Sequence, residues 1–305
     1  MNWKSEIEAA ATRSQGHLRR TPVMTAQGFG LPYPVDLKLE QVQHTGSFKA
    51  RGAFNTLLST NVPAAGVVAA SGGNHGAAVG FAASSLGHPA QIFVPEIAGP
   101  AKIALIRRTG ADLTVVPGAY SNALDAARAF EAETGAMQIH AYDAPATLAG
   151  QGTVMREWED QGLTADTILI AVGGGGLIAG ALAWLNGRRK IVAVEPETAC
   201  TLHAALDAGS PVDVDVSGIA ANALGARRIG QLCFDLAKEQ VQSVLVTDAD
   251  IAKAQSALWH DARQLVEPAG ATALAALMSG AYVPAAGERV AVLLCGGNIA
   301  PNPLA

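Results

Sequence analysis

Residues 167–185 read TILIAVGGGGLIAGALAWL, and this stretch decides the fold. The apolar run 167–172 is typical of a strand that is buried on both faces of a parallel sheet. Four glycines follow it, and residues 177–185 have the composition and length of a buried helix. A strand, a glycine turn and a helix in this order form the first half of a βαβ unit. The stretch therefore predicts a parallel sheet that is covered by helices.

The same alternation runs along the whole chain. Residues 67–94 and 168–194 each show a strand, a glycine-rich turn, a helix and a second strand, which suggests two separate sheets. We therefore expect an α/β fold with two open, mostly parallel, twisted sheets and helices on both faces. The predicted strands are residues 35–39, 67–70, 91–94, 113–116, 167–172, 191–194, 241–246 and 290–294. The predicted helices are residues 50–58, 74–86, 101–108, 121–133, 146–161, 177–185, 229–237, 249–265 and 271–278.

Two domains are expected. A smaller domain of residues 47–138 is inserted into a larger one that comprises residues 1–46 and 139–305. No Ser/Pro-rich linker marks these limits, although the polar stretch 209–217 is typical of a loop.

Composition excludes several classes of protein. The chain has 305 residues, of which 50% are hydrophobic and 15% are charged, so it can bury a core and is not disordered. The net charge of −5, without a run of Lys or Arg, argues against nucleic-acid binding. No apolar run approaches the roughly 20 residues that span a membrane, and the N-terminus does not resemble a secretory signal. The odd number of cysteines (Cys200, Cys233 and Cys295) fits a reducing compartment, so we expect a cytoplasmic protein.

A lysine stands in an unusual place in the segment QHTGSFKARG, residues 43–52. Lys49 follows a Gly-Ser turn and Phe48 at a predicted helix start, where the helix dipole disfavours the charged ammonium. A neutral lysine amine can form a Schiff base with a carbonyl compound. The alternative is an ordinary surface lysine in contact with solvent.

A second glycine turn, ASGGNHG at residues 70–76, ends one predicted strand and opens a helix. Backbone N–H groups, the Ser71 hydroxyl and the Asn74 amide together suit a carboxylate or another anion. Alternatively, Asn74 simply caps the helix. His75 fits a supporting role better than an acid–base role, because no acidic residue is near it in sequence.

The four glycines of the first stretch predict a phosphate site, because glycines allow several N–H groups to point inward at a helix N-terminus. Gly174, Gly176 and Ala179, with Glu195 further along, also match a dinucleotide fingerprint, so a nucleotide-dependent oxidoreductase is a rival hypothesis. That hypothesis leaves the Lys49 and Asn74 turns without a role. Cys295 also precedes a glycine turn, whereas Cys200 and Cys233 fit ordinary packing positions.

All these turns follow strands or open helices, and ligands of α/β sheets collect at the carboxyl ends of the strands. A single cofactor with a phosphate and a reactive carbonyl would use the turns together. Pyridoxal 5'-phosphate is such a cofactor.

The same residues resemble a known family. The segments GSFKARG at 46–52, SGGNHG at 71–76, GGGG at 173–176 and CGGN at 295–298 are similar to those of the fold type II (tryptophan synthase β-like) pyridoxal-phosphate enzymes. Within these enzymes the chain most resembles the serine/threonine dehydratases. The resemblance covers nearly the whole chain, and AGQGT at 149–153 and VEPAGA at 266–271 also match.

The resemblance implies a role for each turn. Lys49 carries the cofactor as a Schiff base, Phe48 lies against its pyridine ring, Asn74 donates to its phenolic oxygen, and Cys295 faces the ring nitrogen. The phosphate is held by Gly173, Gly174, Gly175, Gly176 and Leu177. The substrate carboxylate is held by Ser71, Gly72, Gly73, Asn74 and His75. The cofactor lies between the two domains.

The implied reaction is a β-elimination that dehydrates and deaminates L-threonine or L-serine to a 2-oxo acid and ammonia, with Lys49 as general base. A thiol at Cys295 donates only weakly, so the ring nitrogen is not held protonated, which favours elimination. The alternatives are a β-replacing synthase and a hydroxyaspartate dehydratase. The expected partner is a small hydroxy amino acid, without nucleic acid or membrane, and a homodimer is expected because relatives are often dimers.

The sequence departs from other branches of this family in two places. Where racemases carry a serine two residues before the asparagine, this chain has Gly72, so a second acid for racemisation is missing. Where metal-dependent relatives hold a divalent ion, this chain has Glu195, Ala199 and Thr201, which leaves one carboxylate, so we expect no strong metal site. We also expect no regulatory domain after Cys295.

Overall fold

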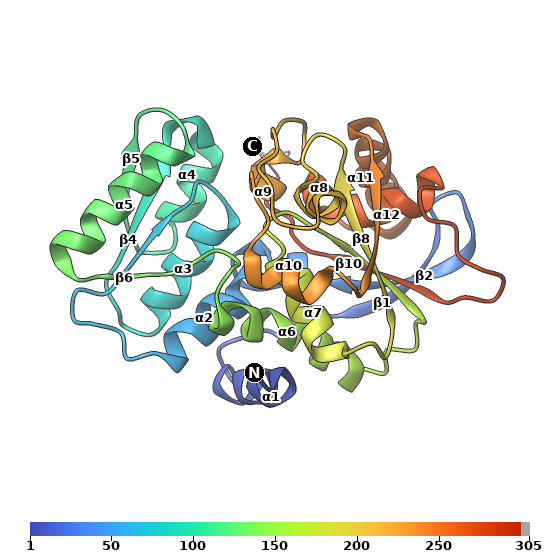
Figure 1. Cartoon of the computed structure of the whole chain (residues 1–305), viewed down its shortest axis with the longest axis horizontal. Helices are drawn as coiled ribbons and strands as arrows, with labels where there is room; N and C mark the ends of the chain where they lie inside the picture. The colour runs from blue at the N-terminus through green and yellow to red at the C-terminus, as the bar shows by residue number, and fades with distance from the viewer. Residues whose placement is uncertain (300–305) are drawn as a thin grey trace.

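The computed structural model describes residues 1–299 and shows two sheets side by side, each flanked by helices (Figure 1). The larger sheet has the strand order β1-β2-β10-β7-β8-β9, and the smaller has the order β5-β4-β3-β6. All pairs are parallel except β1 with β2. The predicted α/β class with two mostly parallel sheets is confirmed.

The element bounds are as follows. The strands are β1 Val23–Gly28, β2 Leu31–Leu39, β3 Val67–Ala70, β4 Ala90–Pro95, β5 Asp112–Val116, β6 Met137–Gln138, β7 Thr167–Ala171, β8 Lys190–Pro196, β9 Val241–Val246 and β10 Val290–Leu294. The helices are α1 Trp3–Arg13, α2 Lys49–Ser59, α3 Asn74–Ser85, α4 Pro100–Arg107, α5 Tyr120–Thr134, α6 Pro145–Asp160, α7 Gly176–Leu185, α8 Thr201–Ala208, α9 Ala221–Leu224, α10 Gln231–Ala237, α11 Asp248–Ala262 and α12 Pro268–Ser279. Three short 3₁₀ turns cover Glu40–Val42, His44–Gly46 and Glu96–Ala98.

Each sheet has its own hydrophobic core. The strands β7, β8 and β10 are buried along almost their whole length, which explains why they read as continuous apolar runs. Apart from the main core of the larger sheet, a second cluster of buried residues lies under α2, α3 and β4. All strands of the smaller sheet lie within residues 67–138, and the domain limits given above stay a prediction.

The structure adds elements that the sequence reading did not predict. The strand β1 is largely exposed and pairs antiparallel with β2 at the edge of the sheet, so it lacks the continuous apolar pattern of the buried strands. The helix α1 buries only Ile7 and Ala10, and α8 has only eight residues. The predicted helix 249–265 ends earlier, at Ala262, because Arg263 adopts a left-handed conformation with φ 54°.

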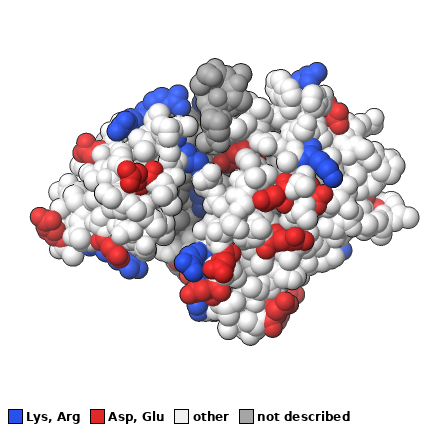
Figure 2. Space-filling model, turned by 90° about the horizontal axis from the view of Figure 1, so that it is seen from above, with Lys and Arg blue, Asp and Glu red and all other residues white. Residues whose placement is uncertain are grey.

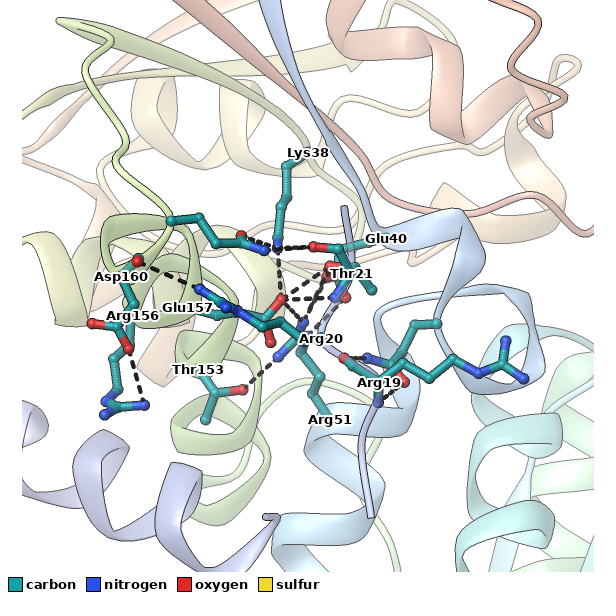
Figure 3. A network of polar contacts seen from close by, with 12 residues as sticks. Arg19, Arg20, Thr21, Lys38, Glu40, Arg51, Thr153, Arg156, Glu157 and Asp160 are labelled. Carbon is teal, nitrogen blue, oxygen red and sulfur yellow. Dashed lines mark hydrogen bonds and ion pairs between the residues drawn. The ribbon is translucent and has the colours of Figure 1, made fainter. Parts of the chain in front are cut away.

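A network of buried charges fixes α2 against the larger sheet (Figure 3). The guanidinium of Arg51 forms two hydrogen bonds, of 2.8 and 2.7 Å, to the carboxylate of Glu40, and a third of 3.0 Å to Glu157. Lys38 donates to the same Glu157 oxygen over 2.6 Å. Since Arg51 and Glu40 are almost completely buried and Arg51 lies two residues after Lys49, this network sets the position of the helix that begins at Lys49.

Seen from above, the surface is hollowed between the part built on the smaller sheet and the part built on the larger sheet (Figure 2). Lys or Arg side chains are visible in this hollow. Among the helices within residues 1–299, none combines the length and the apolar character needed to cross a membrane.

Candidate active site

Lys49 is the first residue of α2, at the helix start that the sequence predicts, and its half-buried side chain lines a cavity. Its Nζ donates a hydrogen bond of 2.8 Å to the carbonyl oxygen of Ala141 and lies 5.2 Å from the centre of the Phe48 ring. Burial of the ammonium lowers the pKa of Lys49 to about 8. The backbone of Phe48 is tied to the end of β10 by a 3.2 Å bond from its N–H to the carbonyl of Cys295. The lysine therefore combines a fixed position with an amine that is easily deprotonated.

One cavity brings together all of the predicted cofactor residues, although they come from distant parts of the chain. Residues from the start of α2, the start of α3, the loop between β7 and α7 and the end of β10 all line it. The lining consists of Phe48, Lys49, Asn74, Tyr142, Ala171 to Ile178, Ala223, Leu224, Ala269 and Cys295. Of the five residues expected to hold the substrate carboxylate, only Asn74 lines this cavity.

The glycine loop is so closely packed that side chains do not fit on it. A Cβ atom on Gly174 would lie 2.3 Å from the Tyr142 ring. Gly175 has a φ of +91°, and a Cβ there would lie 2.7 Å from the Cβ of Cys233. Glycine is therefore favoured by space at Gly174 and by both space and conformation at Gly175.

The loop also offers free hydrogen-bond donors. The backbone N–H groups of residues 173–176 have no acceptor within the described residues 1–299. They lie at the N-terminus of the ten-residue helix α7, where the helix dipole favours an anion. This arrangement fits a phosphate group.

The Asn74 side chain is held in one orientation by two partners. Its Nδ2 donates to Oε1 of Glu267 over 2.5 Å, and its Oδ1 accepts a 2.8 Å bond from Nδ2 of Asn298. Burial raises the pKa of Glu267 to about 7. The second amide hydrogen of Asn74 has no acceptor in the described part of the chain, so it can serve a ligand in the cavity.

The turn before α3 joins the end of β3 to the helix, and its role in holding a substrate carboxylate stays a prediction. The Ser71 hydroxyl accepts a 3.2 Å bond from the N–H of Gly73. The Nε2 of His75 donates to the carbonyl of Ile139 over 2.9 Å, and burial together with the Lys49 charge lowers the pKa of His75 to about 3. His75 is thus neutral near pH 7 and has a supporting position rather than an acid–base one.

The thiol of Cys295 donates to the carbonyl of Ala269 over 3.4 Å and faces the cavity. Burial, with a contribution from the nearby Glu267, raises the pKa of Cys295 to about 12. The group is therefore a neutral, weak donor and not a thiolate.

The sequence reading missed several residues that shape the site, among them Ala223 and Leu224 of α9, which line the cavity. Tyr142 packs against Gly174, and the Ala141 carbonyl accepts from Lys49, yet neither belongs to a recognisable motif. The role of Glu267 as partner of Asn74 was also not predicted, because 193 residues separate the two in sequence.

Glu195, considered above as an ion ligand, accepts 2.8 Å bonds from the N–H groups of Leu202 and His203. Its carboxylate thus caps the first turn of α8. Burial raises the pKa of Glu195 to about 7.

The cavity fits pyridoxal phosphate by the chemistry of its donors. It offers a reactive amine for the aldehyde, a side-chain-free loop of N–H groups for the phosphate, one free amide hydrogen for an oxygen, and a neutral thiol.

Comparisons with known proteins agree with this chemistry. The sequence profile of the family described as "Pyridoxal-phosphate dependent enzyme" matches residues 15–296. Phenylserine dehydratase from Ralstonia pickettii is 36% identical over 303 residues, which cover 96% of this chain and 92% of that protein. L-threonine ammonia-lyase from Geobacter sulfurreducens is 36% identical over 301 residues, covering 96% and 75%. The structure of maize serine racemase superposes with a TM-score of 0.93 at 30% identity, covering 99% and 95%.

Proposed function

Because the chain belongs to the family of pyridoxal-phosphate dependent enzymes, we propose that it is an ammonia-lyase that converts L-threonine or L-serine into a 2-oxo acid and ammonia. The observation that carries this proposal is that the Lys49 amine, with a pKa of about 8, shares one cavity with the glycine loop. The names of the relatives support an ammonia-lyase.

The residues of the cavity have different roles in the proposed reaction. Bound pyridoxal phosphate supplies an electron sink for the electron pair that remains when the Cα proton of the substrate is removed. Lys49 takes that proton, since a lysine whose pKa is lowered to about 8 has a substantial neutral fraction at mildly alkaline pH and can act as a base. The N–H groups of residues 173–176 hold the phosphate, and the free hydrogen of Asn74 orients the ring.

Cys295 favours elimination over reactions that need a long-lived carbanion. A neutral thiol does not hold a ring nitrogen protonated, so the electron sink is mild. Prompt loss of a β-hydroxyl suits such a sink.

Gly72 argues against racemisation as the main reaction. This position has no hydroxyl that could protonate the opposite face of the substrate. A Cβ placed on Gly72 would lie 2.4 Å from the Cβ of Ala98, so the turn is packed for glycine.

A substrate panel tests the proposal. The protein loaded with pyridoxal phosphate is mixed with L-threonine, L-serine or 3-hydroxyaspartate without any added nucleophile, and release of 2-oxo acid is measured. We expect turnover of threonine or serine, loss of turnover in Lys49→Ala, and no loss with a chelator. Turnover only after addition of a nucleophile would favour a β-replacing synthase, and turnover of 3-hydroxyaspartate alone would favour the corresponding dehydratase.

A further inference from the structure

The carbonyl oxygen of Gly173, in the glycine loop of residues 173–176, accepts a hydrogen bond from a side chain outside the loop. Oγ1 of Thr201 donates to the carbonyl oxygen of Gly173 over 2.6 Å. Thr201 is the first residue of α8 and is completely buried. The strands β7 and β8 are parallel neighbours, so the loop after β7 and the helix that follows β8 meet at the same edge of the sheet.

Thr201 is itself held in place by Glu195. The Glu195 carboxylate accepts from the N–H groups of Leu202 and His203 at 2.8 Å, and its Oε1 lies 3.3 Å from the Thr201 hydroxyl. A hydroxyl carries one hydrogen, and the shorter contact to Gly173 uses it. The first turn of α8 is therefore anchored, and it presents the hydroxyl to the loop.

The planarity of the peptide bond gives this contact a consequence for the cavity. The carbonyl of Gly173 and the N–H of Gly174 belong to one peptide group and point in opposite directions. Glycine residues otherwise allow this peptide to rotate. A hydrogen bond that fixes the carbonyl on the outer side thus fixes the N–H of Gly174 on the side of the cavity, which Gly174 lines.

We propose that Thr201 is a positioning residue that orients the glycine loop for the phosphate of the cofactor through its bond to the Gly173 carbonyl. It reaches the phosphate only through that peptide, and its effect is on cofactor affinity. The proposal rests on cofactor binding alone and is independent of which substrate is converted.

Thr201→Val tests the contact, because valine keeps the branched shape of threonine and has a methyl group in place of the hydroxyl. Thr201→Ser restores it. Thr272→Val is the matched control, since Thr272 is also fully buried and donates over 3.0 Å to a carbonyl, that of Pro268, within α12.

The measurement is titration of each apoenzyme with pyridoxal phosphate and, separately, with pyridoxal, which lacks the phosphate. We expect Thr201→Val to weaken the affinity for pyridoxal phosphate by about tenfold, the size of one lost hydrogen bond with a buried acceptor left unpaired. Its affinity for pyridoxal stays unchanged, and Thr201→Ser and Thr272→Val bind both compounds like the wild type.

Three results would overturn the proposal. These are unchanged affinity of Thr201→Val for pyridoxal phosphate, an equal loss for both compounds, and failure of Thr201→Ser to restore binding. If the valine variant does not fold, Thr201→Ala is compared with Thr201→Ser instead. The quantity compared is the ratio of the affinity for pyridoxal phosphate to the affinity for pyridoxal. A chain that binds both compounds as expected but converts no amino acid would refute the proposed function and leave this inference intact.

Discussion

The Nζ atom of Lys49 and the carbonyl oxygen of Ala141 lie 2.8 Å apart, and no carboxylate within residues 1–299 forms an ion pair with this amine. A carbonyl accepts a hydrogen bond without stabilising the positive charge as a carboxylate would. The amine is thus held in place while its proton remains easy to remove.

The first prediction concerns the pH at which Lys49 reacts. The neutral amine is the form that attacks an aldehyde, and its pKa of about 8 lies below the ordinary 10.5. The rate at which apoenzyme combines with pyridoxal phosphate should therefore rise about tenfold per pH unit up to pH 8 and then level off. The rate is followed by absorbance after rapid mixing, with Nα-acetyl-lysine as control for the ionisation of the cofactor itself. A rate that still climbs steeply between about pH 9 and 10 would show an ordinary lysine.

The second prediction concerns the packing of the glycine loop. Gly174→Ala places a Cβ atom 2.3 Å from the Tyr142 ring, so the loop must move, and affinity for pyridoxal phosphate should fall by at least about tenfold. Adding Tyr142→Ala removes the obstacle and should recover part of the affinity, because neighbouring residues are not additive. Gly187→Asn, at a position with open space and a φ of +75°, serves as control. Equal affinity in Gly174→Ala and wild type would mean that the loop is not tightly constrained.

The third prediction concerns the charge network beneath α2 (Figure 3). Arg51→Met leaves the fully buried Glu40 without its bidentate partner, which should cost about 3–5 kcal/mol of folding free energy. Equilibrium unfolding in urea measures this cost. Arg128→Met breaks an exposed pair with Asp125 and should change stability by less than about 1 kcal/mol. If both variants changed the free energy of unfolding by a similarly small amount, the charge network would not be what positions Lys49.

The fourth prediction concerns Cys295. Because its pKa is raised to about 12, the thiol is neutral across the ordinary working range, and serine offers a comparable neutral hydroxyl. Cys295→Ser should keep turnover within roughly threefold and leave the shape of its pH profile unchanged. Cys295→Asp should alter the profile, since an acid there can share a proton with the ring nitrogen. Strong loss of turnover in the serine variant would show that sulfur itself is needed.

Much of this site was predictable because its parts follow buried strands. The strands before the two glycine turns are apolar throughout, and the turn after each opens a helix, so the sequence alone located both turns. The anions that these turns hold stay a prediction. The partners of those turns were not predictable. Glu267, Asn298 and Thr201 act through contacts between elements that are far apart in the chain, and single polar residues give no periodic signal. The exposed edge strand β1 was not predicted because it lacks an apolar run.

The position of β10 between β2 and β7 has a consequence for how the chain is made. The four strands β3 to β6 are contiguous in sequence and can pair while the ribosome is still at work. The six-stranded sheet remains in two pieces until residues 290–294 have emerged, because β10 alone joins its first two strands to the rest. Since Cys295 directly follows β10 and lines the cavity, the cavity is complete only after this strand has been made.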